Sequence, residues 1–101
     1  MTKRMHLTRK RFVDAFDALF EPKEAASLKA RADLMDEIVE IVGKQNLTQA
    51  QAAAKCGISQ PRMNALMKGH IEKFSLDALF NIATALGRRV TIKVAGPRRA
   101  A

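Results

Sequence analysis

The stretch AKCGISQPRMNALMKG, residues 54–69, interrupts a helix-forming run with Gly57, Ser59 and Pro61. Gly57 can take the left-handed conformation that ends a helix, and Ser59 can cap a helix that follows. Pro61 suits a first helical turn, where its missing N–H costs little. The spacing therefore predicts two short helices joined by a tight turn, the second starting at Pro61 or one residue earlier and running to about Lys68.

The residues on either side of this turn support the same interpretation. Thr48 is a suitable N-cap for an alanine-rich helix over about 49–55. Ala53 has so little bulk that a neighbouring helix can approach closely at that position. In the second helix, Met63 and Leu66 are expected to be buried, which leaves its polar residues for other faces. Two short helices in this arrangement form a helix-turn-helix.

Apolar residues at helical spacing predict three further helices. The first is a short amphipathic helix that Thr8 can cap and that ends near Pro22. The second runs from Pro22 to about Lys44, and the third from its cap Ser75 to Gly87. The last two helices carry these apolar residues: Leu28, Met35, Ile38, Ile41, Val42, Leu76, Leu79, Phe80, Ile82, Ala83 and Leu86.

After Gly87 the pattern changes to alternation. Val90, Ile92 and Val94 alternate with polar residues in RRVTIKV, which is typical of a half-buried strand. No other segment is a convincing strand, so the unpaired backbone groups need a partner outside this chain. The partner is expected to be the same segment of a second copy or a sheet edge on another protein.

The length of 101 residues fits a single domain, and 48% hydrophobic with 28% charged residues is the balance of a globular protein. No run is long enough to span a membrane, and the start MTKRMHLTRKRF lacks the apolar stretch of a signal peptide. We therefore expect a cytoplasmic protein that has no membrane contact.

Catalytic and metal-binding patterns are missing from the sequence. Cys56 is the single cysteine, so there is neither an internal disulfide nor a CxxC spacing for zinc, and a small buried side chain is its simplest interpretation. His6 and His70 are far apart in sequence, and no glycine-rich phosphate loop is present. We expect no enzymatic activity, no catalytic residues, no metal and no cofactor.

The net charge of +8 is unevenly distributed. Basic and acidic residues are equal in number from Met1 to Gly43, so the whole excess lies from Lys44 onward, where Glu72 and Asp77 are the acidic residues. A polyanion is a natural partner for that half, although a basic surface that only aids solubility is the alternative.

The segment LTQAQAAAKCGISQPRMNALMKG resembles the Cro/λ-repressor-like helix-turn-helix regulators, also called the XRE family. The resemblance covers about residues 34–87 and includes the Thr-Gln pair, the Gly-Ile-Ser turn and the closing glycine. It implies an all-α, five-helix λ-repressor-like domain, here with an extra N-terminal amphipathic helix and a C-terminal β-strand. The expected division is 1–33 for the basic arm, amphipathic helix and start of the long helix, 34–87 for the DNA-binding core, and 88–101 for the strand and basic tail.

Within this family the C-terminal strand resembles that of HigA-type antitoxins and small autoregulators, which dimerise and often bind a toxin. The resemblance thus implies a homodimer and, in the antitoxins, a toxin protein as a further partner. Val90, Ile92 and Val94 are the candidate joint of the dimer, and the N-terminal helix from Thr8 to Phe20 is the alternative.

The resemblance also assigns roles to residues at the helix-turn-helix. With the second helix in the major groove of double-stranded DNA, Gln60 would read a base, and Arg62 would reach a guanine or a phosphate. Asn64 would read a base or face water. Phosphate contacts would come from the first helix, the turn and the following loop. The residues expected there are Gln49, Ser59, Lys68, His70 and Lys73. A solvated loop side chain is the alternative for Lys73 and, more strongly, for His70.

The sequence thus predicts a sequence-specific DNA-binding transcriptional regulator, a repressor or autoregulator that binds an inverted-repeat operator, plausibly the antitoxin of a toxin-antitoxin pair. The alternative is a protein-interaction adaptor that acts through the N-terminal helix and the C-terminal strand.

Overall fold

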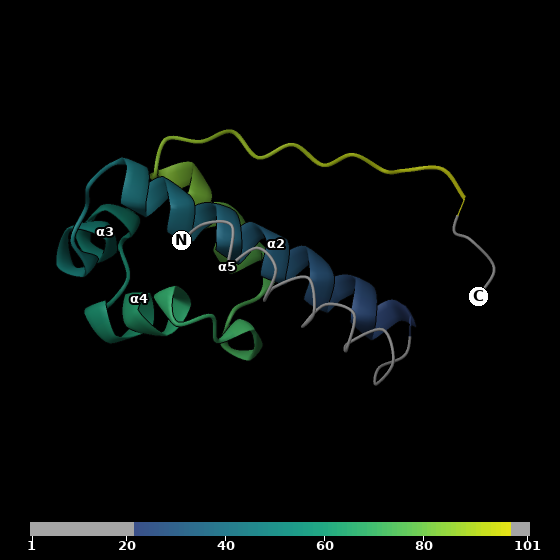
Figure 1. Ribbon diagram of the computed structural model, residues 1–101, viewed down its shortest axis with the longest axis horizontal. Coiled ribbons are helices and arrows are strands. Elements are labelled where there is room, and N and C mark those ends of the chain that lie inside the picture. Colours follow the sequence, from purple (N-terminus) through teal and green to yellow (C-terminus); the bar gives the residue numbers. More distant parts are fainter. Residues whose placement is uncertain (1–21, 98–101) are drawn as a thin grey trace.

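The computed structural model describes residues 22–97. They form α2 (Pro22–Lys44), α3 (Gln49–Cys56), α4 (Gln60–Met67), the short 3-10 helix η1 (Ile71–Lys73) and α5 (Leu76–Ala85), as Figure 1 shows. The amphipathic helix predicted from Thr8 lies outside the described residues.

The long helix α2 is the support on which the rest of the domain packs. It contacts α5, α4 and η1, while α3 packs mainly on α4 and also on α5. In Figure 1, α3 and α4 lie toward the C-terminal end of α2, and the chain after α5 runs back alongside α2. Because α2 continues without a break through residues 33 and 34, the expected division between 1–33 and 34–87 falls inside one helix.

One hydrophobic core joins these helices. Its members come from all five elements, and the residues of α2 predicted to face it are buried, except that Leu28 is half-buried. On α5, Leu76 and Phe80 are exposed, although helical spacing had placed them with the apolar residues of that helix. The largest fully buried side chains are Phe74, Ile38, Met63, Leu66, Leu79 and Leu86.

Two expectations of the fold need correction. The described residues contain four α-helices and one 3-10 helix, where a five-helix domain was expected. The strand expected at Arg89–Val94 is not formed, and no residue between 22 and 97 is in a strand. The physical reason is that a strand is defined by hydrogen bonds to a neighbouring strand, and a single copy of residues 88–97 has none within reach.

None of the helices within residues 22–97 combines the length and apolar character that crossing a membrane requires.

Candidate nucleic-acid interface

The turn between α3 and α4 has the geometry that its sequence predicts. Thr48 caps α3 through a capping box, in which its Oγ1 accepts from the Gln51 N–H at 3.1 Å and its own N–H donates to Gln51 Oε1 at 2.9 Å. Gly57 ends α3 in the left-handed conformation, with φ of 69°. Ser59 Oγ then accepts from the Arg62 N–H at 3.2 Å and caps α4. The angle between the two helices is therefore fixed by three local caps.

Packing determines which face of α4 reaches solvent. Ala52 and Ala53 on α3 are buried, and so are Met63 and Leu66 on α4, so the two helices approach closely over small side chains. The opposite face of α4 begins with the exposed Gln60. The Gln60 side chain makes no hydrogen bond with any residue between 22 and 97, so its amide can bind a ligand without losing an internal partner.

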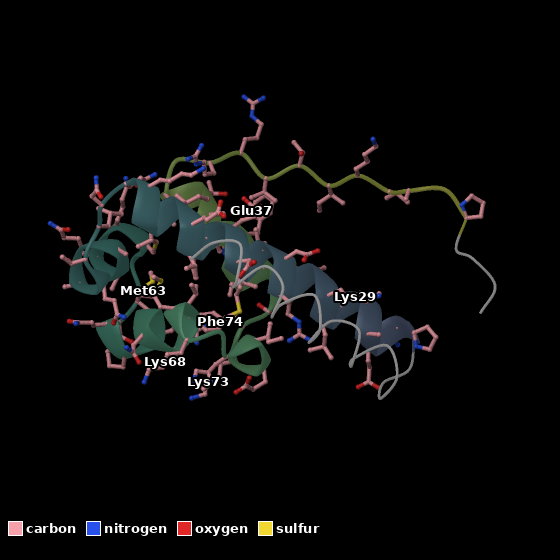
Figure 2. All side chains as sticks on the ribbon, viewed as in Figure 1. Lys29, Glu37, Met63, Lys68, Lys73 and Phe74 are labelled. Atoms are coloured by element: carbon pink, nitrogen blue, oxygen red, sulfur yellow. The ribbon has the colours of Figure 1, made fainter. Side chains whose placement is uncertain are left out.

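Two lysines extend this exposed face beyond α4. Lys68 forms the C-cap of α4 and Lys73 ends η1, and both are exposed. Figure 2 shows them on one edge of the molecule, pointing away from it, whereas Met63 and Phe74 point inward. Ser59, also exposed, lies at the other end of α4 with its hydroxyl hydrogen still available for donation. Three of the residues expected to contact phosphate thus lie along α4 and its following loop.

Asn64 and Gln49 are joined to each other. The Asn64 Nδ2 donates to Gln49 Oε1 at 3.1 Å, and both residues are half-buried. This bond uses the acceptor oxygen of Gln49 and leaves its amide N–H groups for a further acceptor. The geometry therefore favours Gln49 as a phosphate donor and gives Asn64 a supporting contact inside the protein.

Arg62 lies against the loop that follows α4. Its guanidinium carbon is 4.4 Å from the centroid of the Phe74 ring, and its Nη1 donates to the Lys73 carbonyl oxygen at 3.4 Å. Both contacts are intramolecular, so the Arg62 guanidinium must leave the Phe74 ring and the Lys73 carbonyl oxygen before it can reach a base edge. Because Arg62 is exposed, such a rotation costs little burial.

The same loop is held from its other side by α2. Arg31 Nη1 donates to the carbonyl oxygens of Ile71 and Phe74, each at 3.3 Å. Neither Arg31 nor Arg62 forms an ion pair with a carboxylate within residues 22–97. The positive charge of each guanidinium beside the loop is therefore not offset by a paired carboxylate among these residues.

His70 differs from the other expected phosphate contacts because it has an acidic neighbour. Its Nδ1 lies 3.5 Å from Glu72 Oε2, and both side chains are partly exposed. The carboxylate would repel a phosphate at this position, so His70 is the weakest member of the set.

Cys56 lies behind the interface. Its Sγ is 3.8 Å from the Ile82 carbonyl oxygen, which links the end of α3 to α5. Desolvation by partial burial raises the pKa of the Cys56 thiol, and Lys55 acts in the opposite direction. A raised pKa disfavours the thiolate, although Cys56 is half-buried and not fully buried as expected.

Comparison with protein-family models gives a match to a helix-turn-helix domain over residues 17–95. The chain belongs to this helix-turn-helix family. The family match is wider than the resemblance over 34–87, because it includes the whole of α2 and the segment after α5 up to residue 95. Membership of a helix-turn-helix family indicates DNA binding, and such domains are typically not enzymes. No curated protein matches the chain.

Three residues of this helix-turn-helix domain were not singled out from the sequence, although the structure gives them important contacts. Arg31 and Phe74 fix the loop, and Gln45 Nε2 donates to the Leu86 carbonyl oxygen at the end of α5 at 2.9 Å. Arg31 and Gln45 donate to carbonyl oxygens far away in sequence, and the Phe74 ring contacts the Arg62 guanidinium, so no local pattern could have indicated these contacts.

Proposed function

We propose that this protein is a sequence-specific regulator that binds double-stranded DNA with α4 in the major groove. The observation that carries the proposal is the exposed Gln60 side chain, which has no hydrogen-bond partner between residues 22 and 97, at the start of a helix that Ser59 caps directly after the Gly57 turn. A glutamine amide can donate to and accept from an adenine edge at once, which discriminates between base pairs. Gln60 is therefore the principal base reader.

Arg62 and Asn64 have more conditional roles in this proposal. Arg62 reads a guanine or binds a phosphate after leaving the Phe74 ring. Asn64 keeps Oδ1 and its second N–H for a base, but its bond to Gln49 restricts the orientation in which it can offer them. In the free protein both side chains already have partners. A base contact must therefore be more favourable in free energy than any internal contact that is lost when it forms.

Phosphate contacts would hold the register of α4 on the duplex. Lys68 and Lys73 supply point charges, Ser59 supplies a hydroxyl, and Gln49 supplies amide hydrogens that Asn64 orients. His70 contributes less because Glu72 lies beside it.

A second copy would complete the DNA site. One reading helix covers only a few base pairs, so specific binding usually requires two half-sites. Val90, Ile92 and Val94 are the proposed joint, supported by the 83% and 90% exposure of Ile92 and Val94. Two copies related by a two-fold axis would present their α4 helices about 34 Å apart and bind an inverted repeat.

The test is selection of binding sites from a random duplex library, followed by a shift assay of the selected sequence against excess nonspecific DNA. We expect enrichment of an inverted repeat whose half-sites lie one helical turn apart. Recovery of no common sequence, together with equal affinity for all duplexes, would exclude the proposed function.

An adaptor or antitoxin role is the second candidate, and the exposed Ile92 and Val94 favour it because an apolar edge of this kind also fits a sheet of another protein. In an antitoxin the toxin would bind while α4 remains on DNA. A small ribonuclease-like protein encoded by the adjacent gene, and its co-purification with this chain from the cytoplasm, would support that role.

A further inference from the structure

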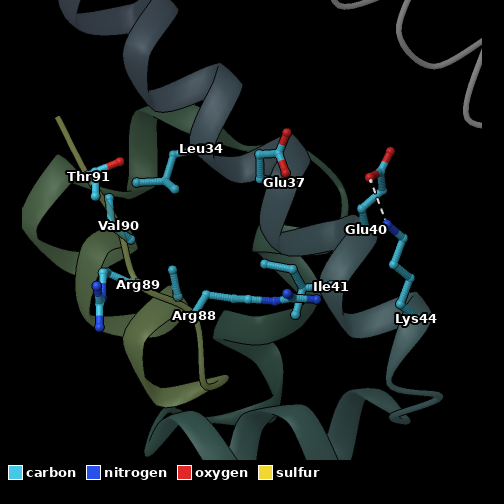
Figure 3. Close-up of a pocket in the computed structure, with 10 residues that line it drawn as sticks. Leu34, Glu37, Glu40, Ile41, Lys44, Arg88, Arg89, Val90 and Thr91 are labelled. Carbon is cyan, nitrogen blue, oxygen red and sulfur yellow. Dashed lines mark ion pairs between the residues drawn. The ribbon is translucent and has the colours of Figure 1, made fainter. Parts of the chain in front are cut away.

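A groove lies beside the point where the chain leaves α5. It has a volume of about 370 Å³, and Figure 3 shows α2 on one side and residues 88–91 on the other. Its apolar part is formed by Leu34, Ile41, Ala83 and Val90, and Glu37 and Glu40 line it from α2. Lys44 pairs with Glu40 at 4.0 Å, while Glu37 has no ion pair with any residue of the described range.

The three apolar residues of the tail have very different surroundings. Val90 packs against the hydrophobic core, whereas Ile92 is 83% and Val94 is 90% exposed. In an extended chain, residues two and four positions after Val90 point to the same side as Val90. On the apolar side of the tail, Val90 therefore packs on the core, whereas Ile92 and Val94 are exposed to solvent.

We propose that the groove receives Val94 from the tail of a second copy, in an antiparallel two-stranded ribbon centred on Ile92. The proposal rests on the dimer described above and adds its register and the surface on which it packs. In this ribbon Val90 faces Val94 of the second copy, and the two Ile92 side chains face each other.

The chain's own Val94 cannot fill the groove. An extended strand rises about 3.3 Å per residue, so Val94 lies about 13 Å along the strand from Val90. An antiparallel neighbour reverses this displacement and returns its Val94 to the side of Val90. The groove carries Lys44, Arg88 and Arg89 of its own chain beside Glu37 and Glu40, so its charge does not attract a basic tail. Its apolar residues are what would receive the exposed Val94 of the second copy.

The register follows from the side chains that would face each other. Centring on Ile92 gives every apolar side chain an apolar neighbour and sets Thr91 opposite Lys93. Shifting by two residues in one direction centres the ribbon on Thr91 and sets Arg89 opposite Lys93. The opposite shift centres it on Lys93, which then faces its own copy. Like charges directly opposite are destabilising, and a shift of one residue would turn the apolar sides apart.

Disulfide crosslinking of single-cysteine variants tests this register. In a Cys56→Ser background, Thr91→Cys, Ile92→Cys and Lys93→Cys are oxidised separately and run without reductant. Facing residues in an antiparallel pair have Cα atoms about 4.5–5.5 Å apart, within disulfide reach, whereas diagonal neighbours are about 7–8 Å apart and are not. We expect a covalent dimer from Ile92→Cys and from neither of the other two, and a mixture of Thr91→Cys with Lys93→Cys should form a mixed dimer.

The groove is tested by Leu34→Ala and Val94→Ala in sedimentation equilibrium, with melting temperature as a check on the fold. Each change should weaken the dimer by about tenfold, since each removes apolar area from the two symmetry-related contacts. In the double variant, dimer affinity should fall by much less than the product of the two single fold-changes. The second substitution removes a side chain whose contact the first has already abolished. Lys93→Ala, which changes the opposite side of the tail, is the matched control and should pair normally.

The outcomes separate this inference from the proposed function. A covalent dimer from Thr91→Cys or Lys93→Cys would leave the dimer intact and overturn the register. Crosslinking at Ile92 with independent effects of Leu34→Ala and Val94→Ala would overturn the groove as the receiving surface. A chain that is monomeric in sedimentation and crosslinks at none of the three positions would overturn both the ribbon and the proposed dimer, whatever its affinity for DNA.

Discussion

Arg31 holds the main chain of Phe74, donating from Nη1 to its carbonyl oxygen at 3.3 Å although the two residues are 43 positions apart. The bond connects α2 to the loop that carries Lys73, so the position of a proposed phosphate contact depends on a residue outside the helix-turn-helix. Arg62 on α4 contacts the same loop through the Lys73 carbonyl oxygen and the Phe74 ring. The loop is thus fixed before any DNA arrives, which lowers the entropic cost of binding.

Replacing Arg31 with Gln should therefore affect both stability and binding. Two half-buried carbonyl oxygens lose a charged donor, so we expect the free energy of unfolding in urea to fall by about 1–3 kcal/mol. Affinity for specific and random DNA should fall together, because Lys73 is displaced. Lys23→Gln removes the same charge from the exposed start of α2 and is the control. Unchanged binding in Arg31→Gln would show that the loop does not need this contact.

Replacing Gln60 with Ala should lower the affinity for the selected operator by about 1–3 kcal/mol, because a bidentate contact to one base is lost. Binding to random DNA should hardly change, and preference at one base position should relax. Titration of both duplexes by fluorescence anisotropy measures this difference. Equal losses on the two duplexes would assign Gln60 to the phosphate contacts instead.

Replacing Lys68 or Lys73 with Ala should give the converse result. All duplexes should bind more weakly, and the slope of log affinity against log salt should decrease by about one unit per lost phosphate contact. Lys23→Ala, at the exposed start of α2 and distant from α4, should leave the slope unchanged. A lysine whose removal also leaves the slope unaltered does not contact phosphate.

Replacing Asn64 with Ala should resemble the loss of a phosphate contact more than the loss of a base contact, because its Nδ2 orients the Gln49 amide at 3.1 Å. We expect a similar weakening on specific and random DNA. In a Gln49→Ala background the same change should have little further effect, since the pair acts as a unit. Additive losses together with a changed base preference would identify Asn64 as a base reader.

Replacing Ile92 with Pro removes one main-chain donor and one apolar side chain from the tail. Circular dichroism should show the helical content unchanged, because Ile92 lies outside the core. Sedimentation should show a monomer, with operator affinity close to the nonspecific level. A variant that remains dimeric and binds normally would move the joint elsewhere, with the helix predicted from Thr8 as the next candidate.

Much of the fold could be predicted from local sequence because its boundaries are made by local chemistry. Thr48, Gly57 and Ser59 each determine the conformation of their own turn, and α3 and α4 begin at the residues that these caps predict. The burial of Met63 and Leu66 follows from helical spacing in the same way. The division into exposed and buried faces of α4 was therefore confirmed.

Contacts between distant segments could not be predicted. Nothing near Arg31 indicates that its guanidinium meets the carbonyl oxygens of Ile71 and Phe74, and Asn64 could equally have faced water. The prediction of a strand at Arg89–Val94 was wrong for a single copy for the same reason: alternation describes side chains, whereas a strand needs a neighbour. Positions with long-range partners thus set the limit of what this sequence reveals.

The extended tail has a consequence for the lifetime of each molecule. Arg88, Arg89 and Lys93 lie in exposed, irregular backbone, the kind of segment that trypsin-like proteases cleave first. Cleavage after Arg88 or Arg89 would remove both Ile92 and Val94, and cleavage after Lys93 would remove Val94, so a trimmed chain would lose part or all of the proposed joint. Incorporation of the tail into a hydrogen-bonded ribbon would withdraw the same bonds from attack. If the proposed dimer forms, proteolysis would therefore act mainly on chains that have not paired with another copy.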